Sequence, residues 1–254
     1  MLREPKKTGA FLRTNLHGQI AEHLGTRVTS GELRPGEILP TEAILGVSLG
    51  VSRTAIREAI KVLSAKGLIE VRRKTGSRVR PQREWNALDP DVISWQFSGE
   101  GLPSAIFDLQ DLRKIIEPAA ARLAAKRATP ADILEIGTAY SEMAQATGNT
   151  AASVEADLRF HLAILEATHN SFMRPFGSLI QAALRASFRL TNVDLAAYRR
   201  SLLRHRKVFT AIRDGSPEEA DLAMQAVLRG TQRDVAHSLE LHGGEEKKAK
   251  LTKK

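Results

Sequence analysis

Residues 31–79 read GELRPGEILPTEAILGVSLGVSRTAIREAIKVLSAKGLIEVRRKTGSRV, and they contain the signals of two helices joined by a tight turn. Thr41 is a good N-cap for the first helix, because its hydroxyl can accept a hydrogen bond from an unpaired backbone N–H. Gly50 suits the end of that helix, and Ser52 can cap the next one. The second helix places its apolar residues on one face, at Ile56, Ile60 and Leu63. The segment therefore predicts a helix-turn-helix pair.

A further helix before this pair and a basic hairpin after it complete the predicted module. Between residues 11 and 30, apolar residues recur every four positions, at Leu16, Ile20, Leu24 and Val28. Two short strands are expected at 68–71 and 77–80, around the basic turn RRKTG at 72–76. Three short helices followed by a basic hairpin are typical of a winged helix-turn-helix, whose helix after the tight turn enters the major groove of DNA.

The positive charge of the chain is concentrated in this module. Residues 1–80 contain 15 Lys and Arg against 7 Asp and Glu, a net charge of +8. Residues 81–244 contain 18 basic and 20 acidic residues, whereas the last ten contain 5 against 2. A basic unit joined to a nearly neutral one indicates a polyanion-binding head on a separate body. Charge alone is equally compatible with a solvated surface.

Composition excludes several classes of protein. The chain has 254 residues and no cysteine, which excludes disulfides, thiol catalysis and zinc–thiolate fingers. The N-terminal residues lack the apolar run of a secretory signal, and no apolar stretch reaches the roughly 18 residues of a membrane span. We therefore expect a cytoplasmic protein without a membrane partner.

The rest of the chain predicts a mainly α fold. From 104 to 242 helical patterns follow one another without a strand signal, which indicates about six helices. The connector before them contains both tryptophans, Trp85 and Trp95, so it is expected to include a short packed helix. The expected domains are the winged helix-turn-helix at 1–80, the linker at 81–103, the all-helical domain at 104–242 and a disordered basic tail at 243–254.

Two resemblances follow from these motifs. The PG turn at 35–36, LPTE at 39–42, GVSRTAIREAI at 50–60 and KGLIEV at 66–71 occur in the order found in GntR-family bacterial transcriptional regulators. The helical remainder resembles the FCD effector domain of the FadR subfamily, through LRKIIEPAAARLAAKRAT at 112–129 and EADLRFHLAILEATHN at 155–170. Within that subfamily, WNALDPDVISW at 85–95 is similar to the linker of sugar-acid regulators.

The resemblance implies a set of DNA-binding residues. Arg53 and Arg57 are one helical turn apart, so both can reach one groove, where Arg commonly contacts guanine. The alternative is that these arginines form ordinary surface ion pairs. Ala43 and Lys74 depart from the family, which often has Arg and Gly there, so the operator sequence cannot be borrowed. The full set is Thr41, Ser52, Arg53, Thr54, Arg57, Arg72, Arg73, Lys74 and Arg78.

The helical domain contains a possible metal site. Asp157 and His161 are four residues apart and share one helix face, which suits either a plain surface pair or a shared metal. The resemblance adds His205 as a further ligand, and it places Val227 where a fourth ligand, a histidine, is usual. A divalent ion (Zn, Ni or Mn) could persist with water or an effector carboxylate in the gap. It could equally be absent, with the three polar residues binding the effector directly.

The resemblance also implies cationic groups for an acidic effector. Arg113 matches an arginine that often lines this cavity, and a guanidinium suits bidentate carboxylate binding. Glu117, one turn later, could orient Arg113 or simply pair with it, and Arg233 is a further candidate. These features lead us to expect a homodimeric repressor that binds a palindromic operator and is released by an aldonate such as galactonate. The alternatives are a different organic acid, an activator, or a metal-dependent enzyme; we expect no enzyme.

Overall fold

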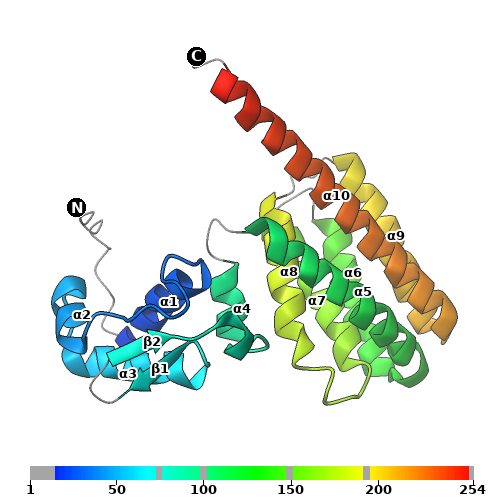
Figure 1. Ribbon diagram of the computed structural model, residues 1–254. Coiled ribbons are helices and arrows are strands. Elements are labelled where there is room, and N and C mark those ends of the chain that lie inside the picture. The colour runs from blue at the N-terminus through cyan, green and yellow to red at the C-terminus, as the bar shows by residue number, and fades with distance from the viewer. Residues whose placement is uncertain (1–14, 73–75, 98–101, 147–150, 191–194, 252–254) are drawn as a thin grey trace. The chain divides into compact units, whose positions relative to one another are not determined.

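The computed structural model describes residues 15–72, 76–97, 102–146, 151–190 and 195–251 (Figure 1). The chain forms two compact units, Met1–Leu102 and Pro103–Lys254. Within the described residues, both strands lie in the first unit and the second unit is helical. The prediction of a mainly α fold with an N-terminal winged helix-turn-helix is therefore confirmed.

The first unit consists of three helices packed beside a small antiparallel sheet. Its core joins the apolar faces of the first and third helices, where Ile20, Leu24 and Ile56 are almost completely buried. In the sheet, Ile69 lies opposite Val79. Both strands are shifted by one residue from their predicted bounds. The elements are α1 (Leu16–Thr29), α2 (Glu42–Leu49), α3 (Arg53–Ala65), β1 (Ile69–Arg72) and β2 (Gly76–Val79).

The segment after the sheet belongs to this first unit. A 3-10 turn (Gln82–Glu84) leads to α4 (Pro90–Gln96), which packs against α1 and buries Trp95 in the same core. Asp89 caps the N-terminus of α4. Its carboxylate also forms an ion pair with Lys66, with 2.7 Å between Nζ and Oδ1. The sequence predicts a separate linker from residue 81; the structure instead adds α4 to the first unit, because the apolar side chains of α4 complete its core.

The second unit is a bundle of six helices within the described residues. Helices α9 and α10 pack along each other, α6 packs on both α7 and α9, and α8 packs on α7. None of the described helices combines the length and the apolarity that crossing a membrane requires. The helices are α5 (Leu102–Arg127), α6 (Pro130–Gln145), α7 (Ala151–Glu166), α8 (Phe176–Leu190), α9 (Leu195–Arg213) and α10 (Pro217–Leu251).

The last helix differs from its prediction. Where the sequence predicts a disordered tail from residue 243, α10 continues to Leu251, and residues 252–254 lie outside the described part of the chain. Gly243 and Gly244 disfavour a helix, but the residues that follow them at 245–251 are all Glu, Lys, Ala or Leu, which have high intrinsic helix propensity. A helix that has already begun needs no new nucleus, so it can extend past the two glycines into these residues.

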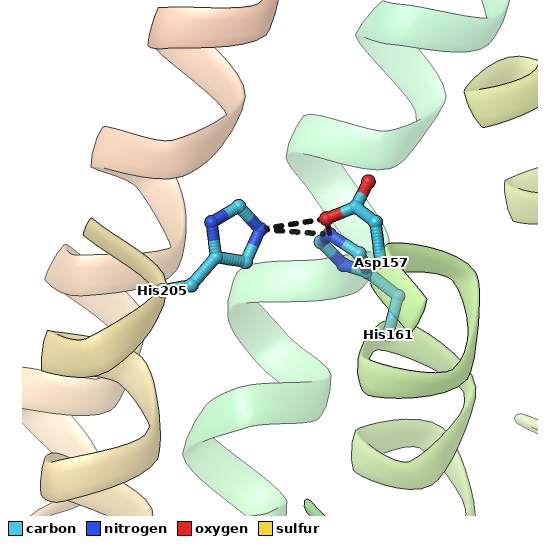
Figure 2. A group of neighbouring side chains, drawn as sticks. All are labelled: Asp157, His161 and His205. Carbon is cyan, nitrogen blue, oxygen red and sulfur yellow. Dashed lines mark hydrogen bonds and ion pairs between the residues drawn. The ribbon is translucent and has the colours of Figure 1, made fainter. Parts of the chain in front are cut away.

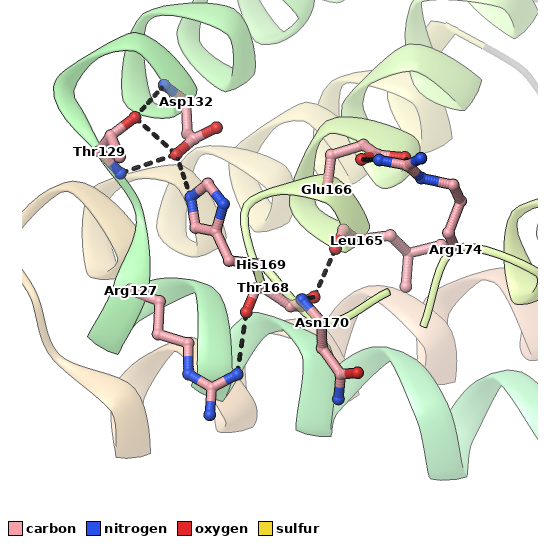
Figure 3. A network of polar contacts seen from close by, with 9 residues as sticks. All are labelled: Arg127, Thr129, Asp132, Leu165, Glu166, Thr168, His169, Asn170 and Arg174. Carbon is pink, nitrogen blue, oxygen red and sulfur yellow. Dashed lines mark hydrogen bonds and ion pairs between the residues drawn. The ribbon is translucent and has the colours of Figure 1, made fainter. Parts of the chain in front are cut away.

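A polar network fixes the start of α6 to the loop after α7 (Figure 3). Thr129 and Asp132 form a capping box, in which each side chain bonds the other's backbone. The same Asp132 carboxylate lies 2.8 Å from His169 Nε2. Arg127 donates to the backbone carbonyl of Thr168, one residue earlier, at 3.0 Å. These bonds hold the end of α7 against α6.

Candidate functional site

The turn between α2 and α3 has the geometry that the sequence predicts. The Thr41 hydroxyl accepts a bond from the backbone N–H of Ile44, and the Ser52 hydroxyl accepts one from Ala55. Gly50 ends α2 with φ of 67°, a left-handed conformation that glycine adopts without strain. The turn therefore presents the N-terminus of α3 at the surface of the unit.

The predicted DNA-contacting residues of α3 lie on its exposed face. Ser52, Arg53, Thr54 and Arg57 are all exposed, while Ile56 and Ile60 on the opposite face are buried. Arg57 forms an ion pair with Glu42 of α2 at 3.1 Å. The surface ion pair considered from the sequence is thus present at Arg57, whose side chain nevertheless keeps 61% of its exposure.

The wing is described only in part. Arg72 is exposed and pairs with Glu70 at 2.9 Å, and Arg78 on β2 is half-buried. Arg73 and Lys74 lie outside the described residues. Arg53, Arg57 and Arg72 are thus each exposed on the first unit, where they are accessible to a ligand such as DNA.

In the second unit, Asp157 and His161 on α7 meet His205 on α9 (Figure 2). The Oδ1 atom of Asp157 lies 3.1 Å from Nε2 of His205 and 3.7 Å from Nε2 of His161. The two Nε2 atoms are 3.4 Å apart. All three side chains are buried, so the structure brings together the three residues that the sequence singled out.

The outer nitrogen of each histidine faces an acceptor. His205 Nδ1 lies 2.8 Å from the backbone carbonyl of Ser201, and His161 Nδ1 lies 2.5 Å from the Glu117 carboxylate. Both acceptors favour a proton on Nδ1, which leaves the lone pair of each Nε2 directed at the other ring. Two lone pairs and a carboxylate oxygen therefore converge, and a cation between them would relieve their repulsion.

These three donors fit a divalent metal ion. Ligand atoms ~2.0–2.2 Å from a tetrahedral zinc ion lie roughly 3.3–3.6 Å apart, close to the spacings of the cluster. The carboxylate behind His161 and the carbonyl behind His205 are the outer partners that orient metal-binding imidazoles in proteins. Without a metal ion, a proton on Nε2 of one ring would remove the same repulsion, because that nitrogen would then donate a hydrogen bond.

The carboxylates of this region are ionised. Burial acts to raise the pKa of Glu117, but the charge of Arg113 and the contact with His161 outweigh it and lower the pKa to about 2. For Asp157, burial again acts to raise the pKa, but a hydrogen bond from His205 and the charge of that ring lower it overall, which requires a proton on Nε2 in place of a metal ion. The cluster thus carries two buried negative charges, of which Arg113 compensates one.

Arg113 is buried and incompletely paired. Its side chain is 2% exposed, and its Nε donates to Glu117, which therefore orients it. Among the described residues, neither Nη1 nor Nη2 has a hydrogen-bond partner. The same holds for Oε1 of Gln110, one turn earlier on α5. Because unsatisfied buried donors are costly, these nitrogens are suited to an acidic ligand.

A pocket opens beside the cluster between α6, α7, α8, α9 and α10. Its lining includes polar residues that sequence reasoning missed, because only the packing of α8, α9 and α10 shows which of their faces lines the pocket. Two predicted effector residues do not line the pocket. Arg113 is buried behind Glu117, and Arg233 is exposed, whereas its neighbour Asp234 does line the pocket. The lining residues are Met143, Asp157, His161, Leu184, Ser187, Phe188, Tyr198, Ser201, His205, Thr231 and Asp234.

Val227 lies in the apolar core, as its side chain requires. It is 2% exposed and belongs to the main cluster of buried apolar residues. Thr231, one turn further along α10, is the first residue of that helix to line the pocket. The described chain therefore offers three ligands to a metal, and α10 adds none.

Comparisons with known proteins agree with this two-part construction. The family model of the bacterial regulatory proteins of the gntR family matches residues 16–79, and that of the FCD domain matches residues 108–230. The chain is 37% identical to the Galactonate operon transcriptional repressor of Escherichia coli (strain K12), over 84% of this chain and 93% of that protein. It is 30% identical to the Glc operon transcriptional activator of the same strain, over 88% and 90%.

A solved structure supports the fold. The structure described as "Lar controls the expression of the Listeria monocytogenes agr system and mediates virulence" is 18% identical and covers 89% of this chain and 99% of its own, with a TM-score of 0.63. At this identity the likeness concerns the fold alone. The domains and the relatives together show that the chain belongs to the GntR family of bacterial regulatory proteins, in the FadR-type subfamily with an FCD domain, and is a transcriptional regulator rather than an enzyme.

Proposed function

We propose that this regulator represses an operon for sugar-acid catabolism and leaves its operator when a small polyhydroxy carboxylate binds the FCD domain. Galactonate or a related aldonate is the proposed effector. The observation that carries the proposal is the convergence of Asp157, His161 and His205 near the unsatisfied guanidinium of Arg113. The 37% sequence identity to the galactonate operon repressor supports an aldonate as the effector.

On the DNA side, α3 is the recognition helix. Arg53 and Arg57 contact base edges, Thr41 and Ser52 present helix N-termini to phosphates, and the wing binds the backbone. Two copies of the chain bind the two halves of a palindromic operator as a homodimer in the cytoplasm, because a two-fold protein matches a two-fold site.

On the effector side, the three clustered residues hold a divalent ion such as Zn, Ni or Mn. When bound, the ion supplies a positive charge and open positions for an effector carboxylate. Arg113 binds the acid through its free Nη atoms. In the alternative form of the site, no metal is bound and the cluster binds the acid directly through hydrogen bonds.

Fluorescence polarisation on labelled DNA from upstream of the protein's own transcription unit tests this proposal. The full-length protein is expected to bind at moderate salt and to be released by one acid of an aldonate panel. Repeating the titration after chelation, and again with added Zn²⁺ or Mn²⁺, separates the metal-bound form from the metal-free form. The absence of a specific complex, or of release by every acid, would refute the proposal.

A second candidate function is activation. The Glc operon transcriptional activator is a relative of similar coverage, and the direction of regulation depends on where the operator lies relative to the promoter. Transcription in vitro from the same promoter, with and without the protein, distinguishes the two. More transcript with the protein than without it would establish an activator.

A further inference from the structure

The pocket has a second acidic group on its α10 wall, Asp234. The donor atoms of Asp157, His161 and His205 lie within 4.8 Å of one another, and Asp234 is not a member of that group. It is therefore too distant to complete a metal site with all three, although it faces the same pocket. A ligand held at the cluster would extend into a pocket that also contains this carboxylate.

Arg204 lies against Gly230 and interacts electrostatically with Asp234. A Cβ atom at Gly230 would lie 2.2 Å from Nη1 and 2.8 Å from Cζ of Arg204, so glycine leaves the space that this guanidinium occupies against α10. Burial lowers the pKa of Arg204, while the negative charge of Asp234 acts to raise it. The half-buried guanidinium and the carboxylate of Asp234 thus interact electrostatically, and glycine at 230 permits this arrangement.

Hydroxyl groups surround the same space. They belong to Ser187, Tyr198, Ser201 and Thr231. A carboxylate only accepts hydrogen bonds, so Asp234 pairs well with ligand hydroxyls and poorly with a ligand carboxylate. Like charges placed close together in a partly desolvated pocket repel strongly. A fixed acidic group therefore discriminates against a ligand that brings a carboxylate to the same place.

This inference rests on the proposed function. We propose that Asp234 is a specificity-determining residue of the effector pocket. It accepts hydrogen bonds from the hydroxyl groups of a polyhydroxy monocarboxylate and excludes the dicarboxylate of the same length. Arg204, in the space left by Gly230, is a positioning residue for this carboxylate. The pocket therefore distinguishes the two ends of its effector, with one acidic end at the cluster and one hydroxylated end at Asp234.

Calorimetric titration of the full-length protein with galactonate and galactarate tests the assignment. These acids differ at one end of the chain, where galactonate has a hydroxymethyl group and galactarate a second carboxylate. The wild-type protein is expected to bind galactonate at least tenfold more tightly. Asp234→Asn is expected to bind galactonate roughly tenfold more weakly, the scale of a hydrogen bond to a charged group, and galactarate more tightly than the wild-type protein does.

Three further variants provide the controls. Glu219→Gln makes the same change of charge at an exposed position of α10 and should leave both affinities unchanged. Asp234→Glu retains the charge and should still exclude galactarate, which keeps the test valid if the Asn variant folds poorly. Gly230→Ala displaces Arg204 and should weaken galactonate binding less than Asp234→Asn does.

Each result has a distinct meaning. Equal affinity of the wild-type protein for both acids, or an unchanged ratio in Asp234→Asn, would overturn the assignment while the repressor proposal stands. If no member of a panel of aldonates and aldarates binds either protein, the sugar-acid effector and the role of Asp234 fail together. DNA binding by the same preparations shows whether the head remains functional in that case.

Discussion

Gly25 of α1 lies directly against the indole ring of Trp95 on α4: a Cβ atom at Gly25 would be 2.2 Å from Cε3 of the ring. A ring carbon in a buried position cannot move aside as the end of a flexible side chain can. Glycine at this position therefore permits α4 to pack on α1. The position of the segment after the wing depends on this packing.

We expect Gly25→Ala to destabilise the first unit by about 1–3 kcal/mol, the usual cost of overpacking a core. Chemical denaturation followed by tryptophan fluorescence measures the change, and the emission should shift as Trp95 becomes exposed. Gly18→Ala on the same helix is the matched control, because the three atoms nearest to its Cβ would all belong to the side chain of Asn15. A stability equal to that of the control would contradict the packing described for α4.

Arg57 should contact DNA even though it forms an ion pair with Glu42 in the free protein. Arg57→Ala is expected to weaken operator binding by about 1–3 kcal/mol, the value of one specific arginine contact. Glu42→Gln releases Arg57 from its partner and should strengthen binding. Polarisation titrations at several salt concentrations measure the DNA affinity of both variants. Arg213→Ala is the control, because Arg213 forms an exposed ion pair in the other unit. Unchanged affinity in Arg57→Ala would refute a base contact.

The pKa of Glu117 predicts an acid-sensitive second unit. Because folding lowers the pKa from 4.5 to about 2, the ionised carboxyl stabilises the fold above pH 4.5. This stabilisation, about 3 kcal/mol, disappears as the pH falls from 4.5 towards 2. Thermal unfolding between pH 7 and pH 2.5 measures it.

Glu117→Gln should remove most of that pH dependence and destabilise the protein at pH 7, because Arg113 then remains buried without its partner. The exposed pair of Glu155 and Arg185 offers the control Glu155→Gln, for which little change is expected. Identical pH profiles for the two variants would show that Glu117 is not the responsible group.

Val227→His tests the incomplete set of metal ligands. If the three clustered residues hold a metal, a fourth imidazole on α10 should increase the affinity for Zn²⁺ at least tenfold. Without metal, the buried polar ring should cost about 1–3 kcal/mol. Competition with a chromophoric chelator gives the affinity, and Val227→Ala controls for altered packing. An affinity equal to that of the wild-type protein would mean that residue 227 does not point at the cluster.

The sequence predicts the features that depend on local rules. The caps at Thr41 and Ser52 and the turn at Gly50 need only the chemistry of neighbouring residues, and the structure has all three. Asp157 and His161 share a face because of their spacing on one helix. The addition of α4 to the first unit depends instead on a contact between Gly25 and Trp95, seventy positions apart, which no local pattern reveals.

The effector residues show the same division. Arg233 was selected for its charge, but consecutive residues on a helix point about 100° apart, so the pocket receives Asp234 and not Arg233. Which face of α10 is inside depends on its packing against α9 and α8. The resemblance implies Arg113 and the helical spacing adds Glu117, but only the fold shows that both side chains are buried and paired.

Lys66 joins the end of α3 to the beginning of α4 through Asp89 and Asp91. A cation at a helix C-terminus and anions at a helix N-terminus are each favourable, so one interaction stabilises two helix ends. The end of α3 and the beginning of α4 therefore share one ammonium group, so a displacement of α4 would strain this ion pair as well as the packing of α4 on α1.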